Sequence, residues 1–392
     1  MAKKEKHFLK RFLISLFFVL NIVAAVGLLF ALLAQFISPN TSIMVAYCGL
    51  AFPYLMFTNL FFVFFWLFIK YRFAFISLTL LLLNVNNIDK YFQFSGMDKP
   101  PVCDSCIKIM TYNAQLFGVY NSNNPKEREK DKNLIFDFLD QEQPDIMCFQ
   151  EFFYDKSGKL EFNTLDSLVS MFKLDKRGKK DARNYYATHF PTNLKEEYYY
   201  GLAIFSKSKI VNSGPVELPD TSSTNGALFA DIKYKGDTLR VYCLHLESFK
   251  MDKLDYEVGK MLANTELNDP ELNVKAMKLS NKLTVAFKKR AIQADVIKKH
   301  IKESPYPVII CGDFNDTPAS YTYNQITSGF KDTFRSSGRN KGITYIGDAF
   351  PAYRIDNIAH HRRFSSYGHT VCTDLTVSDH YPVYAYISIK RR

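Results

Sequence analysis

The sequence predicts an α+β protein in which two β-sheets pack face to face with helices outside them, preceded by N-terminal transmembrane helices. Two long apolar segments, 12–37 and 43–69, lie within the first hundred of the 392 residues. After them, short apolar runs typical of buried strands outnumber the segments with helical periodicity. Several of these strands are joined by links of hairpin length, which favours a sandwich of sheets.

The two N-terminal segments are each longer than the roughly 20 apolar residues that cross a bilayer. The first contains only Ser15, Asn21 and Gln35 as clearly polar residues. Such length and uniformity argue against the core helices of a soluble protein. No small-residue cleavage site follows the first segment, which argues against a signal peptide. A third apolar segment, 73–85, is short for a span.

Basic residues predict how these segments are oriented, because positive charge stays on the cytoplasmic side of a membrane. They precede the first segment and separate the second from the third: Lys3, Lys4, Lys6, Lys10, Arg11, Lys70 and Arg72. We therefore expect a cytoplasmic N-terminus and contact with the lipid bilayer through residues 12–88. If 73–88 crosses the membrane, which we favour, the rest of the chain is extracytoplasmic. If that segment lies in the interface, the rest is cytoplasmic.

Charge and cysteine content exclude little. The net charge of +11 divides into +6 for residues 1–100, with nine Lys and Arg against three Asp and Glu, and +5 for the other 292 residues, with 41 against 36. No strong basic field for nucleic acid is therefore visible beyond the anchor. Cys103 and Cys106 form a lone CxxC, which is weak evidence for zinc and would suit a disulfide in an exported domain.

The chain is expected to comprise an anchor of two or three transmembrane helices at 1–90, a linker at 91–106 and one domain at 107–392. In that domain, strands are predicted at 107–113, 146–149, 201–206, 227–233, 238–246, 308–311, 354–358 and 381–389, and helices at 132–141 and 288–302, the latter with a solvated outer face. The segments 154–198 and 249–287 are interpreted as insertions rich in Lys, Glu and Tyr.

Ionisable side chains stand directly beside predicted strands at several points of this domain. Asp313 follows the apolar run 307–310, Glu151 follows 146–149, and Asp379 precedes the last strand. Strand ends in layered α/β proteins are where catalytic groups are usually displayed. Together these junctions predict one acidic, metal-binding, hydrolytic site.

Hydrolysis of a phosphoester requires that the phosphate charge be neutralised, a water activated and the leaving oxygen stabilised. Glu151 is the best candidate for holding Mg²⁺ or Mn²⁺, because hard ions prefer carboxylate oxygens and magnesium needs only one or two of them. Asp379 could contribute directly or through water. Asn113 is neutral, so it can orient metal-bound water or bind phosphate without adding repulsion.

Seven short motifs of this domain are similar to those of the endonuclease/exonuclease/phosphatase superfamily of metal-dependent phosphoesterases, whose members include DNase I-like nucleases. The motifs are Thr111-Tyr112-Asn113, Gln150-Glu151, Gly201-Leu202-Ala203-Ile204, Leu244-His245-Leu246, Gly312-Asp313-Phe314-Asn315, Arg354-Ile355-Asp356 and Ser378-Asp379-His380. Each is weak alone, but seven in the family's order are specific. The resemblance covers about residues 107–390 and implies a four-layer α/β/β/α sandwich with its site at the sheet ends.

The resemblance also implies a role for each site residue. Asp313 is similar to the residue that accepts a proton from the attacking water or orients it, and Asn315 can donate to a phosphate oxygen. His380 resembles the histidine that stabilises the phosphorane-like charge, with Asp356 holding its ring and favouring the charged form. His245 resembles a second, phosphate-facing histidine.

Two features depart from the abasic-site endonucleases of this superfamily. Gln115 stands where they usually carry an acidic residue, and the domain contains no tryptophan. Both weaken a DNA-repair function. Four other histidines of the domain match no motif and are expected at the surface or in loops: His189, His360, His361 and His369.

The sequence therefore predicts a membrane-anchored phosphoesterase that uses Mg²⁺ or Mn²⁺ and activated water, with no covalent enzyme intermediate. The expected substrate is a lipid head group, another phosphodiester or nucleic acid, and no protein partner is predicted. A membrane-bound nuclease and a catalytically inactive scaffold that grips phosphorylated ligands are the alternatives.

Overall fold

The computed structural model describes residues 2–94, 96–98, 103, 106–160, 162–172, 182–219, 225–250, 255, 257–258, 270–347 and 353–389. The chain divides into two compact units. The helical unit comprises residues 1–91 and 317–324, and the sandwich unit comprises residues 92–316 and 325–392. Parts of the predicted linker and of both predicted insertions lie outside the described residues.

The helical unit contains α1 (Ala2–Leu33), α2 (Ile43–Leu50), α3 (Phe52–Ile69), α4 (Tyr71–Leu83) and α5 (Val85–Ile88). By length and composition alone, Glu5–Leu33 of α1 and the whole of α3 could each cross a membrane, and α4 is a shorter apolar helix. The predicted segment 43–69 is divided at Ala51. Pro53 lies in the first turn of α3, where its missing N–H costs no helical hydrogen bond.

Polar side chains from three helices form one network inside the helical unit. Asn21 of α1 accepts a hydrogen bond from Trp66 Nε1 of α3 at 2.9 Å and donates to Ser77 Oγ of α4 at 2.6 Å. Ser77 donates to Asn59 Oδ1 at 2.8 Å, and Asn59 donates to two backbone carbonyls. All four side chains are completely buried. The network therefore joins α4 to both longer helices.

Contacts at the end of α5 show which end of the helical unit it reaches. The ammonium group of Lys90 donates to Gln35 Oε1 at 3.2 Å, to Asn87 Oδ1 at 3.0 Å and to the carbonyl oxygen of Pro318 at 3.1 Å. Asn324 Nδ2 donates to the carbonyl oxygen of Gln35 at 2.9 Å. The chain from α4 to Lys90 thus runs to the end of the unit where α1 finishes, and the downstream segment 317–324 belongs to that end.

Two six-stranded sheets form the sandwich unit among the described residues. The first has the order β10 (Phe330–Asp332), β12 (Asp356–His361), β9 (Val308–Asp313), β8 (Asp237–His245), β7 (Gly226–Tyr234) and β6 (Ile210–Pro215). The second has the order β13 (Ser365–Val371), β14 (Val383–Ser388), β2 (Cys106–Asn113), β3 (Ile146–Asp155), β5 (Tyr198–Ser206) and β4 (Tyr186–Leu194). The strands β1 (Phe92–Gln93) and β11 (Asn340–Lys341) pair with each other and form a separate two-stranded sheet.

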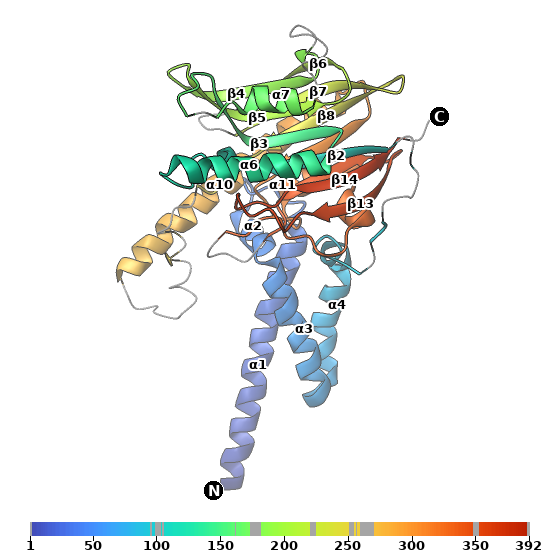
Figure 1. Cartoon of the computed structure of the whole chain (residues 1–392). Helices are drawn as coiled ribbons and strands as arrows, with labels where there is room; N and C mark the ends of the chain where they lie inside the picture. The colour runs from blue at the N-terminus through green and yellow to red at the C-terminus, as the bar shows by residue number, and fades with distance from the viewer. Residues whose placement is uncertain are drawn as a thin grey trace. The chain divides into compact units, whose positions relative to one another are not determined.

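Alternation along the strands separates the layers, because successive side chains point to opposite faces of a sheet. In β8, Cys243 faces the core between the sheets, whereas Tyr242 contacts His300 of α10 (Pro270–Lys302), with its hydroxyl 2.8 Å from Nδ1. In β2, Ile109 faces the same inner core, whereas Met110 packs with residues of α6 (Pro125–Glu142) and α7 (Thr164–Met171). Figure 1 shows α6 and α7 against the sheet that contains β3 and β5. The layer order is helix, sheet, sheet, helix, which confirms the predicted fold class.

Both predicted helices are longer than their apolar periodicity indicates. α6 begins at Pro125 because the side chain of Asn124 accepts a hydrogen bond from the N–H of Lys126 and caps it. α10 begins at Pro270, so part of the predicted insertion 249–287 is helical. The outer face of this helix was expected to be solvated, but one of its basic residues, Arg290, is completely buried.

The expectation that the unmatched histidines lie at the surface or in loops is wrong for His360, and none of the four lies in a loop. His189 is on β4, His360 and His361 are on β12, and His369 is on β13. His360 is completely buried. A strand was predicted at 354–358, but β12 continues to His361, because its pairing with β9 reaches His360 and its pairing with β10 reaches His361.

Replacing Gly312 by alanine should destabilise the protein. The φ of Gly312 is +141°, and a Cβ atom added there would lie 2.1 Å from the carbonyl oxygen of Leu244 on β8. We expect Gly312→Ala to cost at least the ~1–3 kcal/mol typical of overpacking, measured as a lower midpoint of thermal unfolding of the full-length protein. Gly214→Ala is the matched control, since its Cβ would come no closer than 3.4 Å to the Phe229 ring. Equal midpoints for the two variants would contradict this close approach.

Candidate active site

Three ionisable side chains occupy one row of the first sheet. Asp313, the last residue of β9, pairs in register with His245, the last residue of β8, and with Asp356, the first residue of β12. β8 and β9 are parallel and β12 is antiparallel, so the three positions meet at one end of the sheet. Residues directly opposite one another project from the same face of a sheet. The register alone therefore brings these three side chains together.

The second sheet contributes two more residues to the same place. Asn113, the last residue of β2, has its Nδ2 at 3.2 Å from Asp313 Oδ2 and 3.5 Å from Glu151 Oε1. Glu151 lies where the pairing of β3 with β5 shifts register between Phe149 and Phe152, and its φ is +48°. Positive φ is uncommon for a residue other than glycine. A bulge of this kind re-aims a side chain, and here the Glu151 carboxylate lies beside Asn113 from the other sheet.

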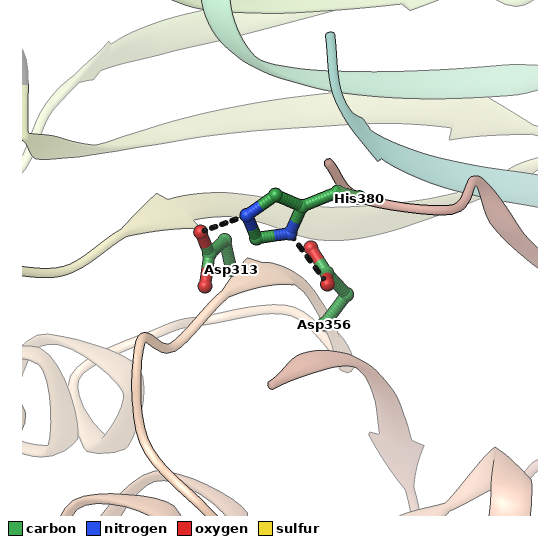
Figure 2. A group of neighbouring side chains, drawn as sticks. All are labelled: Asp313, Asp356 and His380. Atoms are coloured by element: carbon green, nitrogen blue, oxygen red, sulfur yellow. Dashed lines mark hydrogen bonds and ion pairs between the residues drawn. The ribbon is translucent and has the colours of Figure 1, made fainter. Parts of the chain in front are cut away.

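His380 lies between two carboxylates (Figure 2). Its Nδ1 is 2.9 Å from Asp356 Oδ2, while its Nε2 is 3.7 Å from Asp313 Oδ2 and 4.0 Å from Asp379 Oδ1. The ring of Tyr345 packs against the imidazole, with the two ring centroids 5.0 Å apart. Because an ionised carboxylate only accepts hydrogen bonds, Nδ1 is the donor to Asp356. This bond leaves Nε2 directed toward Asp313.

The carboxylates determine the charge of His380. Burial alone would lower the pKa of the imidazole, but Asp356 and Asp313 outweigh burial and raise the pKa to about 10. Burial raises the pKa of Asp313 to about 6, although His380 opposes that shift. At neutral pH the histidine is therefore protonated and Asp313 is mostly ionised. The site holds a buried imidazolium between two acids.

His245 differs from His380 in its charge. Burial lowers the pKa of His245, and the neighbouring Asp313 opposes the change. Its Nε2 lies 3.7 Å from Asp313 Oδ2 and 3.9 Å from Glu151 Oε1, and its Nδ1 has no hydrogen-bond partner within the described part of the chain. A neutral imidazole carries one N–H, so His245 can donate a hydrogen bond in the site without adding charge.

The acidic side chains of the site fit a divalent cation. Asp313, Asp356 and His380 offer ligand atoms within 4.8 Å of one another, but His380 Nδ1 is already engaged by Asp356. Glu151 and Asp379 are more open, with side chains 30% and 38% exposed. Burial raises the pKa of Glu151; His380 opposes the rise and Asp379 adds to it. Mutual repulsion of two carboxylates is what a bound cation would relieve, and carboxylate oxygens are the ligands that Mg²⁺ and Mn²⁺ prefer.

The turn after β9 orients Asp313. The N–H of Asn315 donates to Asp313 Oδ1 at 2.7 Å, and Asn315 Nδ2 donates to the carbonyl oxygen of Leu246 at 2.9 Å. The φ of Asn315 is +51°. The turn ends at Asp316, whose Oδ2 lies 3.3 Å from Nε of the buried Arg290. One N–H of the Asn315 amide is thus used within the protein, and the second remains for a ligand.

Two supporting residues were not expected from the sequence. Gln115 Oε1 accepts a hydrogen bond from the N–H of Asp379 at 3.3 Å. The hydroxyl of Ser378 donates to the carbonyl oxygen of Asn113 at 2.8 Å and accepts from the N–H of His380 at 3.1 Å. In the sequence, Gln115 was noted only because it stands where the abasic-site endonucleases carry an acidic residue. Ser378 was noted only as part of a motif. Their position beside these motifs was the available signal.

The structure places every residue predicted for the site at this one end of the sandwich unit. Contacts among them join Asn113, Glu151, His245, Asp313, Asn315, Asp356, Asp379 and His380. Their individual roles remain predictions.

A four-layer sandwich with an acidic, histidine-containing centre at its strand ends defines a class of hydrolase folds. Residues 110–380 match the model of the Endonuclease/Exonuclease/phosphatase family. The chain belongs to this family, whose members hydrolyse phosphoester bonds. Residues 14–91 match a second family model, described as a domain of unknown function. A search of curated proteins finds no match.

Several solved structures resemble the chain. The human Nocturnin catalytic domain with bound sulfate anion is 18% identical, with a TM-score of 0.47 over 76% of this chain and 97% of that one. D. rerio TDP2 complexed with single strand DNA product is 17% identical, with a TM-score of 0.44 over 73% of this chain and 100% of that one. An endonuclease/exonuclease/phosphatase from Bacteroides vulgatus is 17% identical, with a TM-score of 0.46 over the same shares.

The charge of His380 can be tested without any assay of activity. We expect the His380 imidazole to titrate near pH 10 in an NMR titration of histidine-labelled, full-length protein, because Asp356 and Asp313 hold its proton. Asp356→Asn should lower that pKa, since it removes the nearer carboxylate. Asp374→Asn, at an exposed position outside the site, should leave it unchanged. A pKa that Asp356→Asn does not move would show that this pair does not set the charge.

Proposed function

We propose that this protein is a membrane-anchored, divalent-metal-dependent phosphoesterase that hydrolyses its substrate by direct attack of water. The observation that supports this most strongly is the placement of His380 between Asp356 and Asp313, beside Asn113 of the other sheet. A positive group and a carboxylate in one buried centre suit the two needs of the reaction, which are to stabilise a phosphorane-like charge and to activate water.

Asp313 is the proposed general base. Its pKa of about 6 leaves it ionised at neutral pH but basic enough to take a proton from water. The N–H of Asn315 and the amide of Asn113 fix its two oxygens in place. Water held at this carboxylate would lie between the donors of the first sheet and those of the second.

His380, His245 and the two asparagines are proposed to bind the phosphate. His380 carries the positive charge that offsets charge developing on the phosphoryl oxygens, and Asp356 maintains it. His245 offers a neutral donor, and Asn315 has an amide hydrogen available for a phosphate oxygen. The amide of Asn113 points its hydrogens at Asp313 and Glu151, so it would bind phosphate by sharing these donors. The proposed reaction proceeds by direct attack of water, without a covalent enzyme intermediate.

Glu151, with Asp379 and Asn113, is proposed to hold Mg²⁺ or Mn²⁺. Such an ion, when bound, neutralises phosphate charge and lowers the pKa of water. The exposed share of Glu151 and Asp379 leaves room for the water ligands that magnesium retains. A complete set of acids and histidines favours an enzyme over an inactive scaffold.

The polarity of the helical unit supports a membrane anchor. Its buried positions include the hydrogen-bonded Asn21, Asn59 and Ser77, while large apolar residues such as Phe57 and Phe68 are exposed on α3. The core helix of a soluble protein has the reverse arrangement. Polar groups inside and apolar groups outside are expected of helices that face lipid.

Three crossings and an extracytoplasmic sandwich unit are proposed. α4 starts directly after Lys70. The chain that follows α4 reaches Lys90, whose ammonium group donates a hydrogen bond to Gln35, just beyond the C-terminal end of α1. A segment that runs between the two ends of the unit suits a crossing better than an interfacial position. The disulfide between Cys103 and Cys106 is consistent with the oxidising side of a membrane.

Loss of the metal ligand or of the base should remove activity. With bis(p-nitrophenyl) phosphate and Mg²⁺, we expect Asp313→Ala and Glu151→Ala to lower kcat/KM by about 10²–10⁴-fold, and a chelator to abolish turnover by the unmodified protein. Glu129→Ala, at an exposed position on α6, serves as the control. Turnover retained by both site variants would refute the residue assignment. A folded wild-type protein without turnover would favour the scaffold function.

Reporter fusions test the proposed topology. Alkaline phosphatase fused to the C-terminus should be active in a bacterial host, and green fluorescent protein at the same point should be dark, because only the former folds outside the cytoplasm. Fusions after Arg72 are the matched control and should behave in the opposite way, since Lys70 and Arg72 are expected inside. A fluorescent C-terminal fusion would place the sandwich unit in the cytoplasm.

A further inference from the structure

Four successive residues after β2 form a turn of left-handed backbone. The φ angles of Gln115, Leu116, Phe117 and Gly118 are +42°, +58°, +58° and +72°. Residues other than glycine visit this region singly and not in runs, because their Cβ atom crowds the following carbonyl oxygen. Such conformations persist where the surrounding structure over-determines them, and they cluster at functional sites. The left-handed turn (Gln115–Gly118) therefore requires both an anchor and a reason.

Phe117 anchors the left-handed turn. Its side chain is completely buried. Its ring centroid lies 5.5 Å from that of Phe149 and 5.4 Å from that of Phe152, the latter in an edge-on arrangement. Aromatic pairs at this separation stabilise a fold beyond the burial of their area. These contacts offset the cost of the turn and fix the residue at its start, Gln115.

Gln115 contacts two of the three residues proposed to hold the metal ion. Its N–H donates to Asn113 Oδ1 at 3.2 Å. This bond turns the amide nitrogen of Asn113 toward Asp313 and Glu151. The side-chain Oε1 of Gln115 accepts a hydrogen bond from the N–H of Asp379 at 3.3 Å. One residue thus orients an amide at the end of β2 and the main chain of an acid in the loop before β14.

The carboxylate of Asp379 is held only loosely by its own contacts. The side chain is 38% exposed, and its Oδ1 lies 4.0 Å from His380 Nε2 and 3.5 Å from Ser378 Oγ. Neither distance is that of a strong hydrogen bond. The direction of this carboxylate therefore depends on the main chain that carries it, where Gln115 Oε1 is the acceptor for the N–H of Asp379.

A second contact joins the same loop to the left-handed turn. Asn121, three residues beyond the turn, donates from Nδ2 to the carbonyl oxygen of Val377 at 2.9 Å. The N–H of Asn121 donates to the carbonyl oxygen of Gly118 at 3.0 Å, so the turn positions this side chain. The loop before β14 is thus held at two points by one strained segment of backbone.

We propose that Gln115 is a positioning residue for the divalent cation and that the left-handed turn holds it in place. This inference rests on the proposed function, in which Asn113 and Asp379 contribute to the metal site. Gln115 fixes the amide of Asn113 and the main chain of Asp379, so both are oriented before an ion binds. Its side chain is a neutral amide, which holds Asp379 without adding another carboxylate to an acidic site.

Calorimetric titration of the full-length protein with Mn²⁺, in the absence of substrate, tests this proposal. Gln115→Leu keeps the approximate size of the side chain and removes the acceptor, whereas Gln115→Glu keeps an acceptor oxygen. Gln143→Leu is the matched control. Gln143 also has positive φ, +46°, but it is exposed at the C-terminal end of α6.

We expect Gln115→Leu to weaken Mn²⁺ binding by about 10–100-fold, the typical cost of losing a residue that orients a metal ligand. Gln115→Glu should bind Mn²⁺ at least as tightly as the wild type, and Gln143→Leu should bind it equally. With bis(p-nitrophenyl) phosphate, the kcat of Gln115→Leu should return to the wild-type value at saturating Mn²⁺, because the defect lies in affinity for the ion. A purely structural role would lower the midpoint of thermal unfolding and leave Mn²⁺ affinity unchanged.

The outcomes separate this inference from the proposed function. Equal Mn²⁺ affinities of the wild type and Gln115→Leu, equal losses in Gln115→Leu and Gln115→Glu, or a kcat that stays low at saturating Mn²⁺ would overturn the role of Gln115 alone. A wild-type protein that binds no Mn²⁺ would overturn the metal site, and the role of Gln115 with it. Thermal unfolding without metal shows whether each variant is folded. If Gln115→Leu is not, Gln115→Ser, which is too short to reach Asp379, replaces it with the same expected result.

Discussion

The hydrogen bond between Asp356 and His380 sets the charge on which the rest of the site depends. A buried imidazolium persists only where a carboxylate offsets its loss of hydration, and Asp356 provides this at 2.9 Å. The same pair leaves His380 Nε2 facing Asp313, whose proposed role requires an ionised carboxylate in a buried place. Asp356 occupies its position because the register of β12 on β9 places it beside Asp313. Strand pairing and charge are therefore linked in this centre.

Backbone conformation around the site also helps to direct side chains toward its centre. Glu151 and Asn315 have positive φ although neither is a glycine, and each is itself proposed to act in the reaction. Such conformations persist where the surrounding structure over-determines them. β3 carries Glu151 on a bulge, and the turn after β9 is held by the buried pair of Arg290 and Asp316. The strands thus provide a rigid support on which a few strained residues direct side chains toward one centre.

The sequence was sufficient for those parts of the site that local patterns determine. Asp313 follows an apolar run, and the resemblance of the ordered motifs to those of the family indicated that His245 and Asp356 would join it. The bulge at Glu151 could not be predicted, because it depends on pairing between β3 and β5 that no local pattern records. The burial of Arg290, which donates to Asp316 and to the carbonyl oxygen of Glu247, was missed for a related reason. Polar residues are buried when partners from distant segments satisfy them, and the sequence does not indicate those partners.

The segment 317–324 shows how such long-range packing affects the organisation of the chain. Thr317 follows Asp316 directly, so the segment continues the turn that carries Asp313 and Asn315, yet its packing places it in the helical unit. Ala319 clusters there with apolar residues of α1 and α3, and the carbonyl of Pro318 accepts from Lys90. Removing residues 1–91 would uncover the apolar side of the segment 317–324. This segment begins only a few residues after the proposed general base, Asp313. The segment that directly follows this turn therefore has its packing partners in residues 1–91, which is why the full-length chain is the appropriate form for measuring activity.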